Sequence, residues 1–441
     1  MPTVALVGTL DTKGEEYGFL KRRVEEAGCR VVLIDVGVLG EPQIAPDVAR
    51  GAVLAAAGAD LAALLAAGDR GAIVTAFGKG AGVLLARMVA DRRIQAVAGM
   101  GGSGGTSVVA TAMQALPIGF PKLIVSTMGS GDTSAFVGGA DIAVMHSVVD
   151  IAGNNRILRR VLGNAAAAVS GMARLYTGER GDESGAPVIG ATMFGVTSPG
   201  VTAARRWLEY HGYEVLVFHA NGAGGRSMEA LMRQGLITGV LDITPTELVD
   251  ELVGGQLSAG PERLEVAGAL GLPQVVSLGA LDIANFGPMN TVPERYRHRN
   301  LLVHNPAITL MRTTPEECAR LGTILAQKLN ASRGPVALFI PLRGISALAV
   351  PGGPFHDPAA DAALLGALRG ALMPSIEVVE IDTDINDPSF AESMAECANR
   401  LYRTWRPPGI QATERDPSSY TRDGGGREGS RREPAPVRQT V

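Results

Sequence analysis

The stretch VALVGTLDTKGEEYGFLKRRVEEAGCRVVLIDV, residues 4–36, combines two kinds of hydrophobic periodicity. Its two ends, Val4–Leu10 and Arg30–Val36, are apolar runs of strand length. Between them, the apolar residues of Glu15–Ala27 recur at helical spacing, and Gly28 ends the pattern. A strand, a helix and a second strand in this order predict a parallel βαβ unit.

The same alternation of strand and helix patterns continues along most of the chain. Laying Gly28 on Gly212 places residues 4–36 on residues 188–220 without a gap, through either duplication or convergent patterning. We therefore expect an α/β protein with two Rossmann-like domains, each built on a mostly parallel, doubly wound sheet. Outside the two βαβ units, the predicted strands are 72–76, 95–100, 122–127, 141–144, 240–243, 274–278, 301–304, 336–340 and 376–381, and the predicted helices are 49–67, 261–270, 315–329 and 390–402.

Composition divides the chain into three parts. The polar, Gly-rich segment TGERGDESGAP, residues 177–187, separates an N-terminal domain at 1–180 from a C-terminal domain at 187–405. The last part holds many Arg, Gly, Pro and Ser residues but few large aliphatic ones, so residues 406–441 are predicted to form a disordered tail.

The overall composition excludes several classes of protein. The chain has 441 residues, of which 46% are hydrophobic and 19% charged, so it is long and apolar enough for more than one buried core. Its formal net charge is −4, and no long basic stripe lies outside the tail. Nucleic acid is therefore not expected as a partner.

Targeting signals and cysteine usage favour a cytoplasmic protein. The first residues show neither a basic start nor a long apolar run, so no signal peptide is expected. The uncharged stretch 94–121 is broken by Gly and Pro, so it is not predicted to span a membrane. Cys29, Cys318 and Cys397 are odd in number and show no C-x-x-C pairing, which argues against a disulfide framework and against a thiolate zinc site.

Four Gly-rich segments follow predicted strands of the N-terminal domain: Gly8–Gly14, Phe77–Gly80, Gly99–Thr106 and Ser126–Thr133. Because the carboxyl ends of parallel strands meet at one edge of the sheet, these segments are expected to converge. Gly-rich turns that open onto helices present backbone N–H groups and the positive end of the helix dipole, which favour phosphate oxygens. The predicted cofactor-binding residues are Gly8, Thr9, Asp11, Thr12, Lys13, Gly14, Asp35, Gly78, Lys79, Gly101, Gly102, Ser103, Gly104, Gly105, Thr106, Gly129, Ser130, Gly131 and Asp132.

The charged residues among them have distinct predicted roles. Lys13 and Lys79 would supply positive charge to phosphate oxygens, while Asp11 and Asp132 would hold Mg²⁺ directly or through water. Asp35 ends the second predicted strand, where a nucleotide-binding fold often places the acceptor for a ribose hydroxyl.

No segment matches the Walker A pattern, but one matches a dinucleotide-binding turn. Gly99, Gly101 and Gly104 follow G-x-G-x-x-G after a predicted strand. This single short match keeps open the hypothesis of an NAD-dependent oxidoreductase.

Several motifs in a fixed order resemble one family. They are GTLDTKGEE, FGKGAG, GMGGSGGTS, STMGSGDTSAF, FGVTSPGV and NPAITLMRTTPEE. Over residues 2–405 the chain is similar to the family of the tomato mosaic virus inhibitor ATP-binding domain. The resemblance implies two Rossmann-like domains, ATP bound in the N-terminal one, and a homodimer. It further implies an ATP site lined by Gly8, Thr9, Asp11, Lys13, Gly101–Thr106 and Gly129–Asp132.

The second half of the chain offers candidates for acid–base chemistry. His219, Asp242 and His304 each lie at the end of a predicted strand, so they would converge if all of these strands are parallel. Such a group is suited to proton transfer or to binding a metal ion. The segment His219–Ser227 opens a predicted helix and is a second candidate for binding an anion.

These observations predict a protein that binds ATP and Mg²⁺ through Gly-rich loops of its N-terminal domain. An ATP-dependent enzyme is the natural extension. It would act on a small acidic metabolite in the cleft between the domains, with Lys13 stabilising phosphate charge and His219 or His304 exchanging protons. The alternative is a regulatory dimer that ATP stabilises without turnover, and the NAD-dependent oxidoreductase is the third hypothesis. The sequence leaves open whether the chain is an enzyme.

Overall fold

The computed structural model describes residues 1–178 and 185–405. Most of the predicted boundary segment, residues 179–184, lies outside the described residues. The tail predicted for residues 406–441 also lies outside them.

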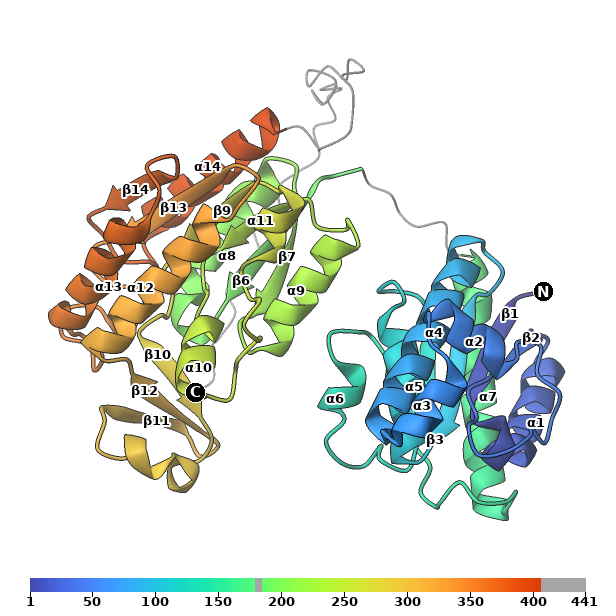
Figure 1. The fold of residues 1–441 in the computed structure, drawn as a ribbon. Helices are drawn as coiled ribbons and strands as arrows, with labels where there is room; N and C mark the ends of the chain where they lie inside the picture. Colours follow the sequence, from blue (N-terminus) through green and yellow to red (C-terminus); the bar gives the residue numbers. More distant parts are fainter. Residues whose placement is uncertain (179–184, 406–441) are drawn as a thin grey trace, which may run out of the picture. The chain divides into compact units, whose positions relative to one another are not determined.

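The N-terminal sheet is parallel throughout and has the order β2-β1-β3-β4-β5 (Figure 1). Its strands are β1 (Thr3–Gly8), β2 (Arg30–Asp35), β3 (Ala96–Gly101), β4 (Lys122–Ser126) and β5 (Ala143–His146). Alternate residues of β1 face opposite sides, so Val4 and Leu6 enter one hydrophobic cluster while Ala5 and Val7 enter another. The doubly wound α/β fold that the sequence predicts is confirmed for this sheet.

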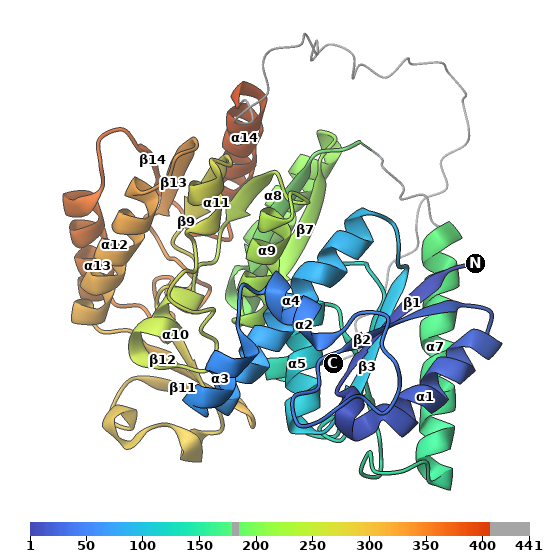
Figure 2. The same ribbon diagram turned by 45° about the vertical axis from the view of Figure 1, so that its right-hand side comes forward.

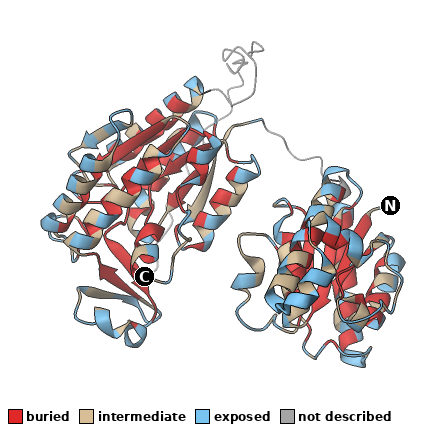
Figure 3. Cartoon of the chain, viewed as in Figure 1, coloured by how far each residue is buried: buried red, intermediate tan, exposed pale blue. Residues whose placement is uncertain are grey.

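Helices cover both faces of this sheet. Helices α1 (Leu10–Glu26) and α7 (Arg156–Gly178) lie side by side on one face, as Figures 1 and 2 show. The other face carries α2 (Arg50–Ala56), α4 (Arg70–Ala90) and α5 (Ser103–Gln114). Two short helices, α3 (Leu61–Ala67) and α6 (Ser134–Val137), lie in the connections. Figure 3 shows the sheet as the most buried layer.

Two predictions for this region are wrong. Residues 72–76, predicted as a strand, lie inside α4, where the Asp69 side chain accepts a hydrogen bond from Ala72 N at 3.0 Å and so starts a helix. The predicted helix 49–67 is two helices, because Gly58 has a φ of +66° and Asp60 begins α3 as a new N-cap.

Helix α4 is the one described helix that is long and apolar enough to cross a membrane. The bent pair α2 and α3, which meet at 86°, would be a second candidate if counted as one span. Phe77, Ala81 and Leu85 of α4 are fully buried in the core of the sheet. Core helices satisfy the same length and composition criteria, and α4 has the packing of a core helix.

The C-terminal sheet is also parallel and has the order β14-β13-β9-β8-β6-β7. Its first five strands in chain order repeat the arrangement of the N-terminal sheet, which confirms the similarity predicted from laying Gly28 on Gly212. Both glycines have a positive φ, of +81° and +88°. The strands are β6 (Val188–Met193), β7 (Glu214–His219), β8 (Gly239–Asp242), β9 (Gln274–Ser277), β13 (Val336–Pro341) and β14 (Glu377–Ile381).

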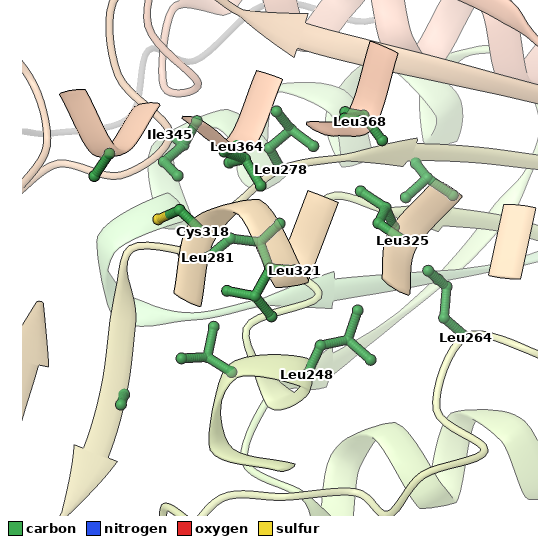
Figure 4. Close-up of a cluster of buried hydrophobic side chains, with 14 of the residues drawn as sticks. Leu248, Leu264, Leu278, Leu281, Cys318, Leu321, Leu325, Ile345, Leu364 and Leu368 are labelled. Atoms are coloured by element: carbon green, nitrogen blue, oxygen red, sulfur yellow. The ribbon is translucent and has the colours of Figure 1, made fainter. Parts of the chain in front are cut away.

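Helices cover both faces of the C-terminal sheet as well. The largest hydrophobic cluster lies where α12 and α13 meet, and Leu321, Leu325, Leu364 and Leu368 pack there (Figure 4). Helices α8 and α14 share a second cluster with the opposite face of the sheet. The helices of this half are α8 (Ser198–Tyr210), α9 (Ala223–Arg233), α10 (Glu247–Val253), α11 (Val266–Leu270), α12 (Pro315–Asn330), α13 (Pro358–Ala371) and α14 (Pro388–Thr404).

A separate antiparallel sheet was not predicted. It has the order β10-β12-β11 and consists of β10 (Ile283–Phe286), β11 (Leu301–Asn305) and β12 (Ile308–Arg312). Residues 301–304 form a strand, as predicted, but this strand belongs to the antiparallel sheet, so the condition that all of the predicted strands are parallel is not met. A tight connection between β11 and β12 reverses the direction of the chain, so the two strands are antiparallel. Parallel neighbours would need a longer crossover connection.

Candidate functional site

The candidate site lies at the carboxyl edge of the N-terminal sheet, where the strand order reverses between β1 and β3. Strand β1 leads to α1 on one face, and β3 leads to α5 on the other. In open α/β sheets, ligands bind beyond the strand ends at such a switch point. Of the four predicted segments, Gly8–Gly14, Gly99–Thr106 and Ser126–Thr133 meet at this edge.

The crevice between β1 and β3 is filled by a tyrosine that the sequence analysis did not single out. Tyr17 is fully buried, and its hydroxyl donates to Val7 O at 2.5 Å and accepts from Met100 N at 2.7 Å. Burial raises its pKa. A Cβ on Gly8 would lie 1.9 Å from Tyr17 Cζ. Glycine is therefore required at position 8 to make room for this ring, rather than for the approach of a phosphate.

The N-terminus of α5 is the most open helix start at this edge. Its N-cap is Gly102, and no side chain caps it. A Cβ on Gly101 would come within 2.8 Å of Gly105 Cα, so the tight turn requires glycine. The exposed Ser103 and the half-buried Gly104 and Gly105 follow in the first turn. This turn has the form that binds anions through backbone N–H groups.

Hydroxyl groups fix this turn to the adjacent strand. Thr106 Oγ1 donates to Gly101 O at 3.2 Å and lies 2.7 Å from Ser126 Oγ, and both side chains are fully buried. Ser126 Oγ also accepts from Met128 N at 3.0 Å. Thr106 thus lies at the site, as predicted, but its buried hydroxyl fixes the turn through hydrogen bonds within the protein.

Arg70 is a candidate ligand-binding residue that sequence reasoning missed. It is exposed at the start of α4, and its Nη2 lies 3.3 Å from the position of a Cβ on Gly104. A guanidinium therefore lies beside the open start of α5, where it adds positive charge and N–H donors. The sequence analysis missed Arg70 because it assigned residues 72–76 to a strand. In the structure a helix starts at Arg70, and its first turn lies at the carboxyl edge of the sheet.

The loop after β4 is exposed and contains the predicted residues Gly129, Ser130, Gly131 and Asp132. Asp132 Oδ1 accepts from Ser134 N at 2.9 Å, and the hydrogen bonds from Ser134 lower the pKa of this carboxyl group. The loop is positioned to contact a ligand over α5, because Thr127 N donates to Gly101 O at 3.2 Å.

The segment Gly8–Gly14 is mostly helix, since α1 begins at Leu10. Lys13 Nζ donates a hydrogen bond to Ile151 O. Asp11 Oδ2 accepts from Leu39 N at 2.6 Å and Gly40 N at 3.3 Å, while its buried Oδ1 has no hydrogen-bond partner. The structure therefore gives Lys13 and Asp11 contacts within the chain.

The neighbouring predicted residues occupy the same turn. Thr12 is exposed and its hydroxyl donates to Thr9 Oγ1 at 3.1 Å, whereas the buried Gly14 lies against the side chain of Gln43. The two predicted Mg²⁺ ligands lie in different elements: Asp11 is in the first turn of α1, and Asp132 is in the loop after β4. The described part of the chain contains no group of three or more His, Cys, Asp or Glu side chains suited to a metal ion.

Asp35 is buried and serves as a helix cap. Only 1% of it is exposed, and its Oδ1 accepts from Leu10 N at 3.2 Å and Gly37 N at 2.9 Å. Burial raises the pKa of this carboxyl group. The predicted contact with a ribose hydroxyl would require the carboxylate to leave the start of α1.

Gly78 and Lys79 do not belong to a loop, contrary to the prediction. Both lie inside α4, where the backbone N–H groups serve the helix. A Cβ on Gly78 would lie 2.6 Å from Thr111 Cβ of α5, and one on Gly80 would lie 2.0 Å from Val53 O of α2. These glycines let three helices pack closely, and Lys79 is exposed.

The acid–base candidates of the second half do not form one group. His219 is exposed at the end of β7, with its ring 5.3 Å from that of Phe194, whereas His304 is exposed on β11 of the antiparallel sheet. The predicted convergence of His219, Asp242 and His304 is therefore wrong, because β11 is not part of the parallel sheet.

Asp242 instead belongs to a fully buried ionic cluster around Arg263. Arg263 Nη1 and Nη2 donate to the two oxygens of Asp242 at 2.6 and 2.9 Å, and Nε donates to Glu247 Oε2 at 2.5 Å. Glu247 Oε1 accepts from Gly222 N at 2.7 Å and Gly225 N at 3.1 Å, at the start of α9. The anion cradle predicted in His219–Ser227 thus holds a carboxylate of the same chain.

Comparison with known proteins identifies similar sequences along nearly the whole described chain. Residues 2–178 match the N-terminal domain of the uncharacterised protein family UPF0261, and residues 186–402 match its C-terminal domain. A UPF0261 protein of Clostridium tetani is 47% identical over 394 residues, which cover 89% of this chain and 97% of that protein. A UPF0261 protein of Rhizobium meliloti is 47% identical over 396 residues, with the same coverage of both chains.

A plant protein is also similar. The ToMV resistance protein Tm-1(GCR237) of Solanum lycopersicum is 42% identical over 311 residues, which cover 69% of this chain and 41% of that protein. Among solved structures, that of Acinetobacter baumannii MurG aligns over 92% of this chain and 96% of that chain, with 11% identity. Its TM-score is 0.21, which is too low to support any argument about fold or function.

Proposed function

Because the chain belongs to the uncharacterised protein family UPF0261, whose N- and C-terminal domains both match, we propose from its own geometry that the N-terminal domain binds ATP with Mg²⁺. The phosphate groups bind at the start of α5. Gly102–Gly105 supplies backbone N–H donors, Arg70 supplies a guanidinium, and Gly129–Asp132 closes over the ligand.

The observation that carries this proposal is the position of Arg70. Its guanidinium reaches Gly104, at a helix start that no side chain caps. Two other helix starts already hold a carboxylate of the same chain: Asp35 lies at α1, and Glu247 lies at α9. The start of α5 has no side-chain cap and has the guanidinium of Arg70 beside it, which favours binding of an anion there.

ATP binding without turnover is the second candidate. His219 and His304 lie on different sheets, so for the ATP-dependent enzyme we keep only one of them as the residue that exchanges protons. Asp242 is committed to Arg263, so it is not available as a base. The engagement of Asp35 at α1 removes the predicted ribose acceptor for ATP and for NAD alike, so competition between the two nucleotides in the titration tests the NAD hypothesis. The small acidic metabolite, the homodimer and the cytoplasmic location remain predictions.

Isothermal titration of the full chain with ATP and Mg²⁺ tests the proposal. We expect Arg70→Ala to weaken binding about five- to tenfold, because it removes an exposed charge-assisted hydrogen bond that contributes about 1 to 1.4 kcal/mol. Lys79→Ala is the matched control, since it removes the same charge from the same helix away from α5. Absence of heat in the unmodified protein, or equal losses in the two variants, would refute the proposal. A parallel assay for ADP release separates turnover from binding alone.

A further inference from the structure

Strands β1 and β3 stop pairing just before the candidate site. Their parallel register runs from Val4 opposite Ala96 to Val7 opposite Gly99. Beyond this point β1 and β3 lead to helices on opposite faces, and each stays paired only with its other neighbour: Gly8 with Asp35 of β2, and Gly101 with Ser126 of β4. Direct pairing of β1 with β3 therefore no longer fixes the distance between the Gly8–Leu10 turn and the Gly101–Ser103 turn.

The Tyr17 hydroxyl bridges the two strands where their pairing ends. It donates to Val7 O at 2.5 Å, accepts from Met100 N at 2.7 Å and lies 3.1 Å from Met100 O. The side chain is fully buried, so water does not compete for these backbone groups. One oxygen atom therefore replaces the next rung of the β-ladder.

Met100 is followed directly by the turn that starts α5. Gly101 O accepts from Thr106 Oγ1 and from Thr127 N, both at 3.2 Å, so a shift at Met100 moves both the turn and the loop after β4. The position of the phosphate-binding N–H groups thus depends on a side chain from α1, on the opposite face of the sheet.

We infer that Tyr17 is a positioning residue: its hydroxyl holds the α5 turn in the geometry that binds phosphate. This inference rests on the proposed function for its effect on affinity, but not for its effect on the turn. Tyr17 itself does not contact the ligand, because it lies beneath Gly8.

Tyr17→Phe tests the inference, since it removes the hydroxyl and keeps the ring. Hydrogen–deuterium exchange of the ligand-free protein should increase at least fivefold at the amides of Thr106 and Thr127, which donate to Gly102 O at 2.8 Å and to Gly101 O at 3.2 Å. The Kd for ATP with Mg²⁺ should also rise at least fivefold. Tyr213→Phe is the control, because Tyr213 is 8% exposed and its hydroxyl donates to Asn399 Oδ1 at 2.7 Å in the C-terminal domain. It should change neither value.

A second variant approaches the same ring from the other side. Gly8→Ala places a methyl group 1.9 Å from Tyr17 Cζ and should displace the ring, so the same amides should exchange faster. If the increase in Tyr17→Phe is confined to Met100, whose N–H loses its acceptor, the inference is overturned.

The two proposals fail in different ways. If the unmodified protein does not bind ATP but the amides of Thr106 and Thr127 exchange faster in Tyr17→Phe, the proposed function fails and the positioning role stands. If the unmodified protein binds ATP and Tyr17→Phe alters neither exchange nor affinity, the positioning role fails and the proposed function stands.

Discussion

Replacing Arg263 with Met would leave three buried carboxylates, those of Asp242, Glu247 and Glu229, without their shared cation. Asp242 and Glu247 are 1% and 0% exposed, so water does not reach them in the native fold. Met keeps most of the aliphatic volume of Arg. The substitution therefore changes the charge inside the cluster much more than its packing.

The expected cost follows from what remains around each carboxylate. Breaking a buried ion pair by removing one partner costs about 3 to 5 kcal/mol. Arg263 donates to two carboxylates and lies 3.9 Å from a third, that of Glu229. Without Arg263, Asp242 keeps the Thr192 hydroxyl at 2.6 Å, Glu247 keeps the N–H groups of Gly222 and Gly225, and Glu229 keeps that of Leu264. These remaining donors lower the penalty for each group, so we expect a total loss of about 3 to 5 kcal/mol rather than twice that value.

Urea denaturation, followed by circular dichroism, measures this loss as a lower unfolding midpoint. Arg343→Met is the matched control: Arg343 also makes a two-pronged contact with an aspartate, Asp382, but the two side chains are 61% and 67% exposed. It should leave the midpoint unchanged, because exposed ion pairs contribute little. A loss below about 1 kcal/mol in Arg263→Met would refute the reasoning, since it would mean that the cluster is accessible to water or tolerates uncompensated charge.

Two further predictions concern stability. Gly78→Ala should destabilise the protein by about 1 to 3 kcal/mol in urea denaturation, because the new Cβ would lie 2.6 Å from Thr111 Cβ. The control is Gly163→Ala in α7, where the new Cβ would meet no atom within 4 Å, and this change should be neutral or slightly stabilising. Destabilisation by both changes would point to helix glycines as such rather than to the α4–α5 contact. Burial raises the pKa of Asp250 to about 7, so its contribution to stability is fully present below its unfolded pKa of about 4 and is lost as the pH rises towards 7. Asp250→Asn should remove this part of the pH dependence, because Asn does not ionise. The neighbouring Asn285 has an unpaired Oδ1, and after rotation of its amide this oxygen can accept a hydrogen bond from an amide or a protonated carboxyl group at position 250. Identical pH profiles of the urea midpoint between pH 4 and 8 in the two proteins would contradict the assignment.

The sequence predicted the repeated framework well because its signals are local. The strand–helix–strand pattern of residues 4–36 became β1, α1 and β2, and its shifted copy became β6, α8 and β7. It failed at residues 72–76, because a short apolar run fits a buried strand and a buried helix equally well. Two features separate the alternatives in the structure: the Asp69 cap, and the contact of Gly78 with α5, which depends on tertiary packing.

The candidate site was predicted in part for a similar reason. Glycine-rich turns after strands are visible in sequence, and the Gly101–Thr106 turn lies where it was expected. Whether such a turn is open to a ligand or filled by the protein depends on residues that are distant in sequence. Tyr17 fills the space beside Met100, 83 positions away, and Asp35 caps a helix that begins 25 positions earlier. Arg70 could have been found from the Asp69 cap preceding it, had residues 72–76 been interpreted as helix.

The carboxylate of Glu247 at the start of α9 has a consequence for stoichiometry. A group tethered to its own binding place competes at an effective concentration that is typically millimolar, without diffusing away. Arg263 holds this carboxylate in place through its Nε. A dissolved nucleotide would have to displace a covalently attached competitor in the C-terminal domain, whereas the start of α5 has none, so under the proposed function we expect saturation at one nucleotide per chain.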